Sequence, residues 1–238
     1  MQHPMRHTTD ATPAIEAVIF DVDGTLIDSN DLHIEAWREA FARYGKTVGY
    51  DELHAQIGKG GDQLMPVFLS RAELEKFGEA LDRVRGEIFV ADYLPLARPF
   101  PKVRELMERL KADGRRMALA TSAKVTELDA HKKSLKVDDL LEAVTSADDA
   151  EHSKPSPDIF LAALEQIGHV APENALVIGD SPYDARAAAR AGMRTIGLLS
   201  GGFESKTLEK EGVIAIYRDI ADLLERYDES PFAASYTL

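Results

Sequence analysis

Short runs of apolar residues alternate along the chain with longer segments whose apolar residues recur every three or four positions. Most of the short runs are apolar throughout, as in strands that helices cover on both faces, rather than alternating in polarity. They predict strands at 17–20, 116–120, 142–146, 175–179, 194–199 and 213–217. Strands separated by helical patterns indicate an α/β fold with a mostly parallel sheet.

Helices are expected between these strands. Segments 101–113, 158–167 and 182–191 carry apolar residues at helical spacing, and a glycine follows each of them. A glycine at that place is typical of a helix end, because it adopts left-handed backbone angles without a steric penalty. A shorter helix is expected at 208–211, and a last amphipathic helix opens at Asp219.

A long segment, 30–95, departs from the alternation because it holds helical patterns and no convincing strand. We expect one amphipathic helix over 31–44 and another over 70–94, which opens with a capping-box spacing. The glycine-rich GKGGDQ, at 58–63, is expected to form a turn between them. The predicted organisation is a flexible tail (1–13), a core domain (14–29 and 96–238) and an inserted helical cap domain (30–95).

Composition narrows the classes of function. The formal net charge of −13, from 41 acidic and 28 basic residues, argues against a nucleic-acid partner, since such proteins usually present a basic face. The absence of cysteine excludes disulfides and thiol chemistry. No apolar run approaches the roughly 20 residues that span a bilayer, and the N-terminus lacks a secretory signal. We therefore expect a cytoplasmic protein without a membrane partner, and interpret His3 and His7 as tail side chains rather than metal ligands.

Polar side chains gather where the predicted strands end, at the edge where open α/β sheets bind ligands. In chain order they are Asp21, Asp23, Thr121, Ser122, Lys154, Asp180 and Asp184. Two carboxylates one residue apart repel each other unless a cation or a shared proton neutralises them. Because Mg²⁺ prefers oxygen ligands, the sequence predicts a Mg²⁺ site formed by Asp21, Asp23 and Asp180.

Four motifs carry these residues, and together they make the chain resemble the Mg²⁺-dependent phosphohydrolases of the haloacid dehalogenase superfamily. The motifs are DVDGTLID (21–28), ATSA (120–123), KPSPDIF (154–160) and GDSPYD (179–184). They follow the family's order, and the resemblance covers nearly the whole chain beyond the tail. It implies a Rossmann-like three-layer core with a mostly parallel sheet plus an inserted α-helical cap domain, as in the phosphoglycolate phosphatase and β-phosphoglucomutase branch.

The resemblance also implies the catalytic pair. Asp21 would be the nucleophile that forms an aspartyl-phosphate. Asp23 would protonate the leaving oxygen and then activate water, as a general acid and base. Gly24 would let the chain turn tightly beside the phosphate.

The other matched residues have implied roles and structural alternatives. Thr121 and Ser122 would hold phosphoryl oxygens, or could cap the helix that follows. Lys154 would balance the charge between nucleophile and phosphate, or could be a solvated surface lysine. Asp180 would bind the metal. Asp184 would ligate it or lie in its outer shell, and could also complete a capping box.

Residues of the predicted cap are candidates for substrate contacts. His33 and Trp37 lie one helical turn apart in HIEAW, which resembles the pattern of sugar-phosphate members of the family. They could line the inner face of the cap, or could be helix residues packed against the core. Lys59, in the glycine-rich turn, could meet an anionic group of the substrate or could be a surface lysine. Arg85 lies on the long cap helix and is a further candidate.

These patterns predict a Mg²⁺-dependent phosphatase that hydrolyses a small organic phosphate monoester, a small phosphorylated metabolite being its partner. The alternative is a sugar-phosphate mutase of the β-phosphoglucomutase type, which shares the cap and the paired aspartates. Those mutases resemble EDS at the fourth motif, where this chain has GDSPYD. A phospho-accepting signalling domain would be much shorter and would lack Asp23, which is placed to activate water.

Overall fold

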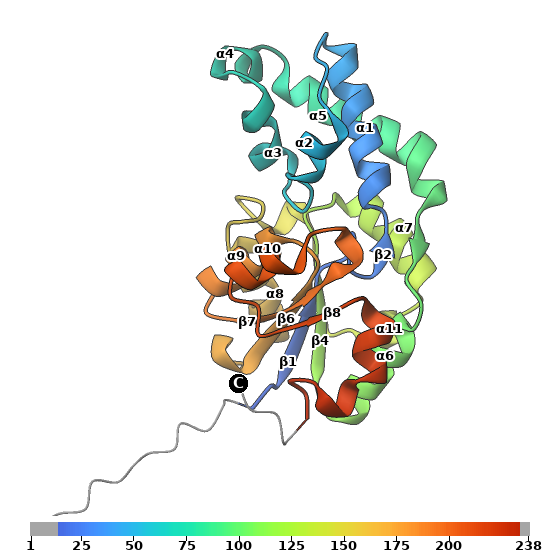
Figure 1. Ribbon diagram of the computed structural model, residues 1–238, viewed down its shortest axis with the longest axis vertical. Helices are drawn as coiled ribbons and strands as arrows, with labels where there is room; N and C mark the ends of the chain where they lie inside the picture. Colours follow the sequence, from blue (N-terminus) through green and yellow to red (C-terminus); the bar gives the residue numbers. More distant parts are fainter. Residues whose placement is uncertain (1–13, 234–238) are drawn as a thin grey trace, which may run out of the picture.

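A six-stranded parallel sheet forms the base of the molecule in the computed structural model, which describes residues 14–233 (Figure 1). Its spatial order is β5-β4-β1-β6-β7-β8. The strands are β1 (Ala17–Phe20), β4 (Arg116–Ala120), β5 (Ala143–Thr145), β6 (Ala175–Gly179), β7 (Arg194–Leu198) and β8 (Ala215–Tyr217). All six coincide with predicted strands. β5 and β8 are shorter than expected, because each lies at an end of the sheet and pairs with a neighbour on one side only.

Strand β1 lies between β4 and β6 and is completely buried. Its successive side chains point to opposite faces of the sheet. Val18 and Phe20 therefore pack into one hydrophobic cluster, and Ala17 and Ile19 into another. This explains the uninterrupted apolar run in the sequence, since both faces of the strand need apolar side chains.

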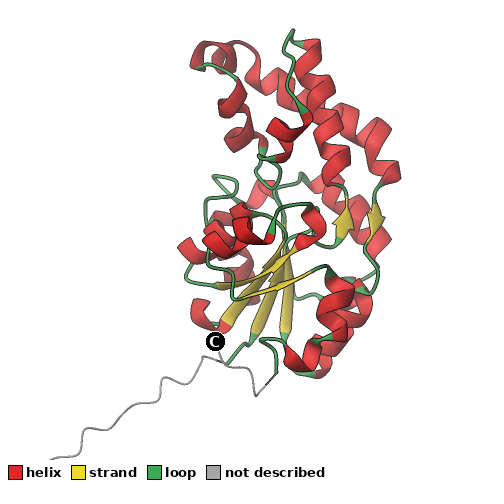
Figure 2. Ribbon diagram, viewed as in Figure 1, coloured by secondary structure: helices red, strands yellow, loops and turns green. Residues whose placement is uncertain are grey.

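Helices cover both faces of the sheet, so the core has three layers (Figure 2). The helices α6 (Val103–Ala112), α7 (Val125–Leu135) and α11 (Ile220–Glu225) contribute to one cluster. The opposite cluster contains side chains of α8 (Asp158–Ile167) and α9 (Pro182–Arg190). The three-layer α/β fold predicted from the sequence is confirmed.

Some helix boundaries differ from the prediction. The helix expected at 208–211 is α10 (Ser205–Lys210), which starts three residues earlier, after Glu204. Lys102 has left-handed backbone angles and precedes α6, so that helix starts at Val103 rather than at Pro101. Short 3₁₀ turns, without clear periodicity, complete the core at Asp138–Leu140, Ala147–Asp149, Pro172–Asn174, Leu199–Gly201 and Tyr227–Glu229.

The helical region, called the helical cap below, sits above the sheet in Figure 1 and has a hydrophobic cluster of its own. It comprises α1 (Asn30–Arg43), α2 (Tyr50–His54), α3 (Gly61–Phe68), α4 (Arg71–Glu73) and α5 (Glu79–Ile88). Two π-helical turns, Leu74–Gly78 and Phe89–Tyr93, join α4 and α5 to the 3₁₀ turn Leu94–Leu96, so the long predicted helix is one continuous helical segment.

Helices α2 and α3 were not predicted. The glycine-rich turn is shorter than the expected 58–63, because α3 begins at Gly61. Leu64 and Met65 of α3 are buried in the hydrophobic cluster of the helical cap. This packing stabilises a helix that the glycine-rich sequence does not predict.

The two chain segments between core and helical cap lie side by side. They form a small antiparallel ladder of β2 (Ile27–Asp28) and β3 (Arg98–Pro99). Ile27 and the neighbouring Ala97 are buried in a cluster of the core. The helical cap is thus anchored directly beside the end of β1, where the candidate residues lie.

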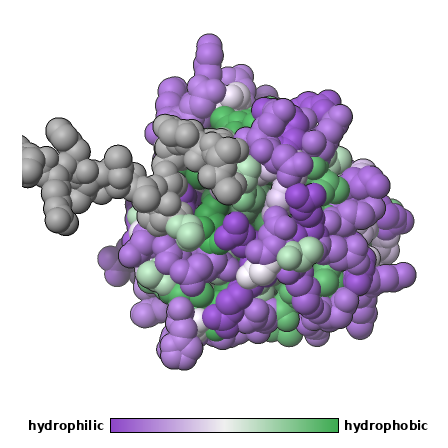
Figure 3. Space-filling view, turned by 90° about the horizontal axis from the view of Figure 1, so that it is seen from below, coloured by the Kyte–Doolittle hydropathy of each residue, from purple (hydrophilic) through white to green (hydrophobic). Residues whose placement is uncertain are grey.

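Within residues 14–233 no helix combines the length and the apolar character that crossing a membrane requires. The face opposite the helical cap is covered mostly by hydrophilic residues, with small hydrophobic areas between them (Figure 3). The predicted tail, with His3 and His7, lies outside the described residues.

Candidate active site

The loops that leave β1, β4 and β6 converge below the helical cap. Because β1 pairs with β4 on one side and with β6 on the other, Asp21, Thr121 and Asp180 follow neighbouring strands at the same edge. The backbone N–H of Asp21 donates to the carbonyl of Ile178 at 2.9 Å, which extends the ladder to the site itself. The sheet therefore brings together residues that are far apart in the sequence, as predicted.

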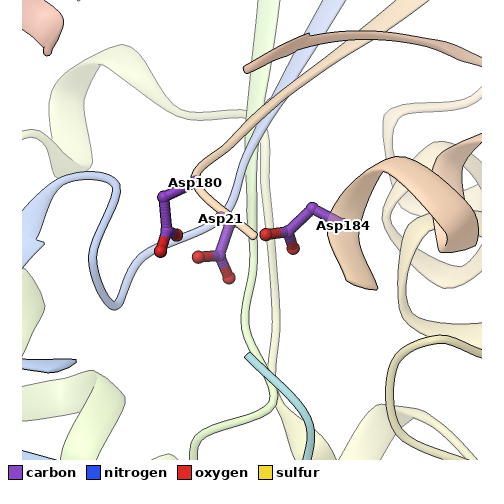
Figure 4. Close-up of side chains that lie close together, drawn as sticks. All are labelled: Asp21, Asp180 and Asp184. Atoms are coloured by element: carbon purple, nitrogen blue, oxygen red, sulfur yellow. The ribbon is translucent and has the colours of Figure 1, made fainter. Parts of the chain in front are cut away.

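Asp21, Asp180 and Asp184 form a buried group, called the carboxylate cluster below. Their side chains lie in a row with Asp21 in the middle (Figure 4), and one carboxylate oxygen of each lies within 4.8 Å of the others. Burial, together with the charges of Asp184 and Asp23, raises the pKa of Asp21 to about 7 against the opposing effect of Lys154. Burial and then the charge of Asp21 raise the pKa of Asp180 well above its usual value. The ionised form of these carboxylates is therefore destabilised by burial and by their mutual repulsion.

Lys154 is the cation that faces the carboxylate cluster. Its ammonium binds Asp21 Oδ1, lies 2.8 Å from Asp184 Oδ1 and donates to the carbonyl of Ala120 at 3.1 Å. The side chain is 1% exposed. Burial alone would lower the pKa of Lys154, but the charges of Asp184 and Asp21 outweigh it and hold the pKa above its usual value. The surface-lysine alternative is therefore wrong.

The carboxylate cluster fits a divalent cation. Three buried carboxylates face a single ammonium, and carboxylate oxygens are ligands that hard cations prefer. Asp180 is held by Thr25 Oγ1 at 2.8 Å and Asn30 Nδ2 at 3.0 Å, so its oxygens are fixed in place. Gly24 has a φ of 77°, and a Cβ there would collide with the Asp180 carboxylate, so the backbone closes tightly around the cluster.

Asp184 has two roles that the sequence left open. Its Oδ2 accepts bonds from the backbone N–H and the hydroxyl of Ser181, at 3.0 and 2.6 Å, so the capping box is present. Its Oδ1 faces Lys154, so it is also a member of the carboxylate cluster. The cap bonds fix one oxygen and leave the other directed at the site.

Asp23 lies apart from the carboxylate cluster, although it was predicted to bind the metal with Asp21 and Asp180. Its Oδ1 accepts from Ser29 Oγ at 2.7 Å and lies 3.0 Å from His33 Nε2 and 3.3 Å from His131 Nε2. Thr121 Oγ1 donates to Oδ2 at 3.3 Å. Burial would raise the pKa of Asp23, but the charges of His33 and His131 hold it well below its usual value.

The two hydroxyls after β4 differ. Thr121 Oγ1 accepts the N–H of Ala123 at 3.0 Å, so it stabilises the turn besides touching Asp23. Ser122 Oγ is buried and makes no hydrogen bond to any described residue. The N-cap position of α7 is Lys124, whose side chain makes no capping hydrogen bond, so neither Thr121 nor Ser122 caps this helix. The Ser122 hydroxyl is therefore a free donor at the site.

A narrow cavity of about 50 Å³ lies between the helical cap and the carboxyl edge of the sheet. It is lined by candidate residues from both sides, among them Asp21, Asp23, Thr121, Ser122, His33, Trp37, Lys59 and Arg85. The cavity is thus the place where Asp21, Asp23 and the candidate cap residues meet.

The cap candidates are held by specific contacts. The ring of His33 stacks on Phe89 with 3.8 Å between centroids. Lys59 donates to Gln56 Oε1 at 2.5 Å and lies over the ring of Tyr183, and burial, followed by the charge of Arg186, lowers its pKa.

The guanidinium of Arg85 lies 5.1 Å from the centre of the Trp37 ring. Its Nη1 donates to Glu127 Oε1 at 3.1 Å. Neither Arg85 nor the partner carboxylate belongs to the four motifs, so this contact is known from the structure alone.

Two buried residues of α7, Glu127 and His131, were missed by the sequence analysis. His131 is 1% exposed, and although burial would lower its pKa, the charge of Asp23 raises it. The available signal was the position of His131 between Leu128 and Leu135, on the apolar stripe of the helix, with Glu127 one turn before it. A titratable group on an apolar stripe points inward, and in this case His131 points towards Asp23.

Comparisons with protein families, curated sequences and solved structures all find proteins similar to this chain. Residues 18–198 match the family described as haloacid dehalogenase-like hydrolase. A phosphorylated carbohydrates phosphatase of Thermotoga maritima is 31% identical, over 86% of this chain and 94% of that protein. A phosphoglycolate phosphatase of Escherichia coli is 29% identical, over 88% of this chain and 91% of that protein. The solved structure of a putative β-phosphoglucomutase from Bacteroides vulgatus superposes with a TM-score of 0.81 at 26% identity, over 91% of this chain and 89% of that chain.

Proposed function

The chain belongs to the haloacid dehalogenase-like hydrolases, and we propose that it is a Mg²⁺-dependent phosphatase that hydrolyses a small organic phosphate monoester. One observation carries this proposal. Asp21 contacts Lys154 and lies in the middle of a row of three buried carboxylates (Figure 4), and it faces the same cavity as the unpartnered hydroxyl of Ser122. A nucleophile, a counter-charge and a free donor are thus gathered at one place.

The first half of the reaction transfers the phosphoryl group to Asp21. A carboxylate oxygen of Asp21 attacks phosphorus, the bond from phosphorus to the ester oxygen breaks, and an aspartyl-phosphate forms. Asp23 gives its proton to the departing alkoxide, which leaves as an alcohol. Because its neighbours hold the pKa of Asp23 low, its protonated form is scarce but strongly acidic.

The second half returns the enzyme to its starting state. Asp23, now a carboxylate, removes a proton from a water that attacks phosphorus, and the bond to Asp21 breaks to release inorganic phosphate. The histidines next to Asp23 favour the carboxylate form that this half needs. Lys154 stabilises negative charge on Asp21 and on the phosphoryl oxygens, and Ser122 donates to those oxygens.

Asp21, Asp180 and Asp184 are the residues that would hold Mg²⁺ in this proposal. The ion supplies positive charge for the oxygens of the transferring group when it is bound. This ligand set replaces Asp23 of the predicted set by Asp184, because Asp184 and not Asp23 shares the buried cluster.

Two further predictions stay part of the proposal. The core and the helical cap are two domains, supported by their separate hydrophobic clusters. The location is cytoplasmic and the partner is a small phosphorylated metabolite, with no role for nucleic acid.

The test is release of inorganic phosphate from a panel of phosphate monoesters, with and without Mg²⁺. Wild-type protein should release phosphate only with Mg²⁺, and Asp21→Asn should lose at least about 1,000-fold of that activity because the nucleophile is gone. The exposed Glu151→Gln serves as the matched control and should keep full activity. Interconversion of sugar-phosphate isomers on addition of a bisphosphate, without phosphate release, would instead identify a mutase.

A further inference from the structure

We propose that Arg85 and Glu127, called the wall pair below, determine which phosphate esters enter the cavity. They favour a leaving group with neutral hydroxyls and exclude one with a second anionic group. This inference rests on the proposed phosphatase function and names the class of its substrate: monophosphates of polyols or sugars rather than phosphorylated acids or bisphosphates.

The wall pair joins the two halves of the cavity. Arg85 belongs to α5 of the helical cap, and Glu127 to the first turn of α7 in the core. Their side chains are 8% and 1% exposed, and both residues line the cavity. The pair is therefore a buried part of the cavity wall rather than a surface ion pair.

Charge is the first reason for selectivity. Arg85 would attract a second carboxylate or phosphate of a substrate, but its charge is already matched by Glu127 at 3.1 Å. A second anion would have to break this contact and leave Glu127 charged, buried and unpaired, which is strongly unfavourable. An anion placed beside the intact pair would be repelled by the same carboxylate.

Hydrogen bonding is the second reason. Arg85 Nε and Glu127 Oε2 are buried and have no hydrogen-bond partner among the described residues. They are a donor and an acceptor that the pair leaves unused. A hydroxyl group both donates and accepts, so one or two hydroxyls of a polyol can satisfy both atoms. A carboxylate or a phosphate dianion offers acceptors only and cannot satisfy Glu127.

Lys59 is the other cation of the helical cap that lines the cavity, and its contacts keep its charge away from the wall pair. It donates to the neutral Gln56 and lies 4.7 Å from the centre of the Tyr183 ring. Its ammonium is thus directed towards Tyr183 of α9 and is separate from the wall pair. The part of the wall formed by Trp37, Arg85 and Glu127 carries no net charge.

A matched pair of substrates tests the proposal. Glycerol 3-phosphate and 3-phosphoglycerate differ only in a terminal hydroxymethyl group against a carboxylate. Wild-type protein should prefer glycerol 3-phosphate in kcat/KM by about 10-fold or more. Glu127→Gln should move this ratio at least about 10-fold towards 3-phosphoglycerate, because Arg85 then has an unmatched charge.

The double variant Arg85→Gln with Glu127→Gln is the control, because it removes both charges and keeps polar side chains in the wall. It should not gain activity on 3-phosphoglycerate, and thermal melts should show that both variants fold. An unchanged ratio in folded Glu127→Gln, or a wild-type preference for 3-phosphoglycerate, would overturn the wall-pair inference and leave the phosphatase proposal standing.

Failure of the phosphatase proposal gives a different result. If wild-type protein hydrolyses neither compound, calorimetric binding of both to wild type and Glu127→Gln still measures the effect of the wall pair. Tighter binding of glycerol 3-phosphate, reversed by Glu127→Gln, would support the pair as a selector. Equal binding of the two compounds would overturn it.

Discussion

The carboxylate cluster, through Asp21, and the wall pair both reach the same cavity, but they differ in how their charges are balanced. In the cluster, three buried carboxylates lie together with one ammonium, that of Lys154, which contacts two of them. In the wall pair, one guanidinium meets one carboxylate. A site with excess negative charge is stabilised when it binds a cation. A site whose charges are already paired is destabilised when a further charge enters. The comparison separates the part of the cavity suited to chemistry from the part suited to choosing the substrate.

The two carboxylates of the first motif show the same contrast at short range. Asp21 has its pKa raised to about 7, chiefly by burial. Asp23 has its pKa held well below the usual value, because two histidines outweigh its burial. Two residues of one type in one motif thus differ through their neighbours, as their proposed roles of nucleophile and acid–base catalyst require.

The largest effect in the comparison should come from Lys154→Met, which removes the only cation of the carboxylate cluster among the described residues. We expect kcat/KM to fall by about 100- to 1,000-fold, because the oxygens of the transferring group lose their fixed positive charge. Without Mg²⁺, the free energy of unfolding should fall by about 3 to 5 kcal/mol, since buried carboxylates lose their partner. Phosphate release and urea unfolding measure the two effects.

The control for this variant is Lys133→Met, which changes an exposed lysine of α7. It should alter the free energy of unfolding by less than about 0.5 kcal/mol. Similar losses in the two variants would show that Lys154 does not balance the cluster.

The pH dependence of stability should be the next largest effect. The pKa of Asp21 is raised from 3.8 to about 7, so the folded protein keeps a proton that the unfolded chain has lost. Without metal, the free energy of unfolding should therefore decrease as the pH rises through this window and level off above it. Mg²⁺ competes with that proton, so it should raise the melting temperature more at about pH 8 than at about pH 5.

Thermal melts at the two pH values, with and without Mg²⁺, measure this difference. The same stabilisation by Mg²⁺ at both would contradict the idea that the ion relieves the carboxylate cluster. Asp180→Asn should reduce the stabilisation by Mg²⁺, since one of the proposed ligands is lost.

The smallest effect is expected from Ser122→Ala, which removes the free donor and leaves both charged groups in place. KM for the best phosphate ester should rise about 5-fold with little change in kcat, which corresponds to about 1 kcal/mol for one hydrogen bond. Steady-state kinetics measure it. An unchanged KM would mean that this hydroxyl does not contact the substrate.

The sequence predicted the central strands because β1 and its neighbours are apolar on both faces, and this requirement is visible in every residue of the run. It predicted the convergence of Asp21, Lys154 and Asp180, since parallel strands place their carboxyl ends at one edge. It did not predict α2 and α3, whose stability comes from packing in the cluster of the helical cap rather than from their own sequences.

The partners of each side chain could not be read from the sequence. Asp184 joined the carboxylate cluster in place of Asp23 because the capping box of α9 turns its free oxygen towards Lys154. His131 reached Asp23 because α7, whose bounds the sequence left undefined, follows the loop after β4 and packs its apolar stripe into the core.

What the sequence by itself determined is the α/β class, the place of the helical insertion and the set of acids, hydroxyls and lysine at the sheet edge. These depend on local patterns: the period of the apolar residues and the residue types that follow each strand. Only the tertiary structure decided how each charge is balanced, because a pKa and an ion pair depend on burial and on neighbours from distant segments. The wall pair joins residues 42 positions apart, and no pattern along the chain connects them.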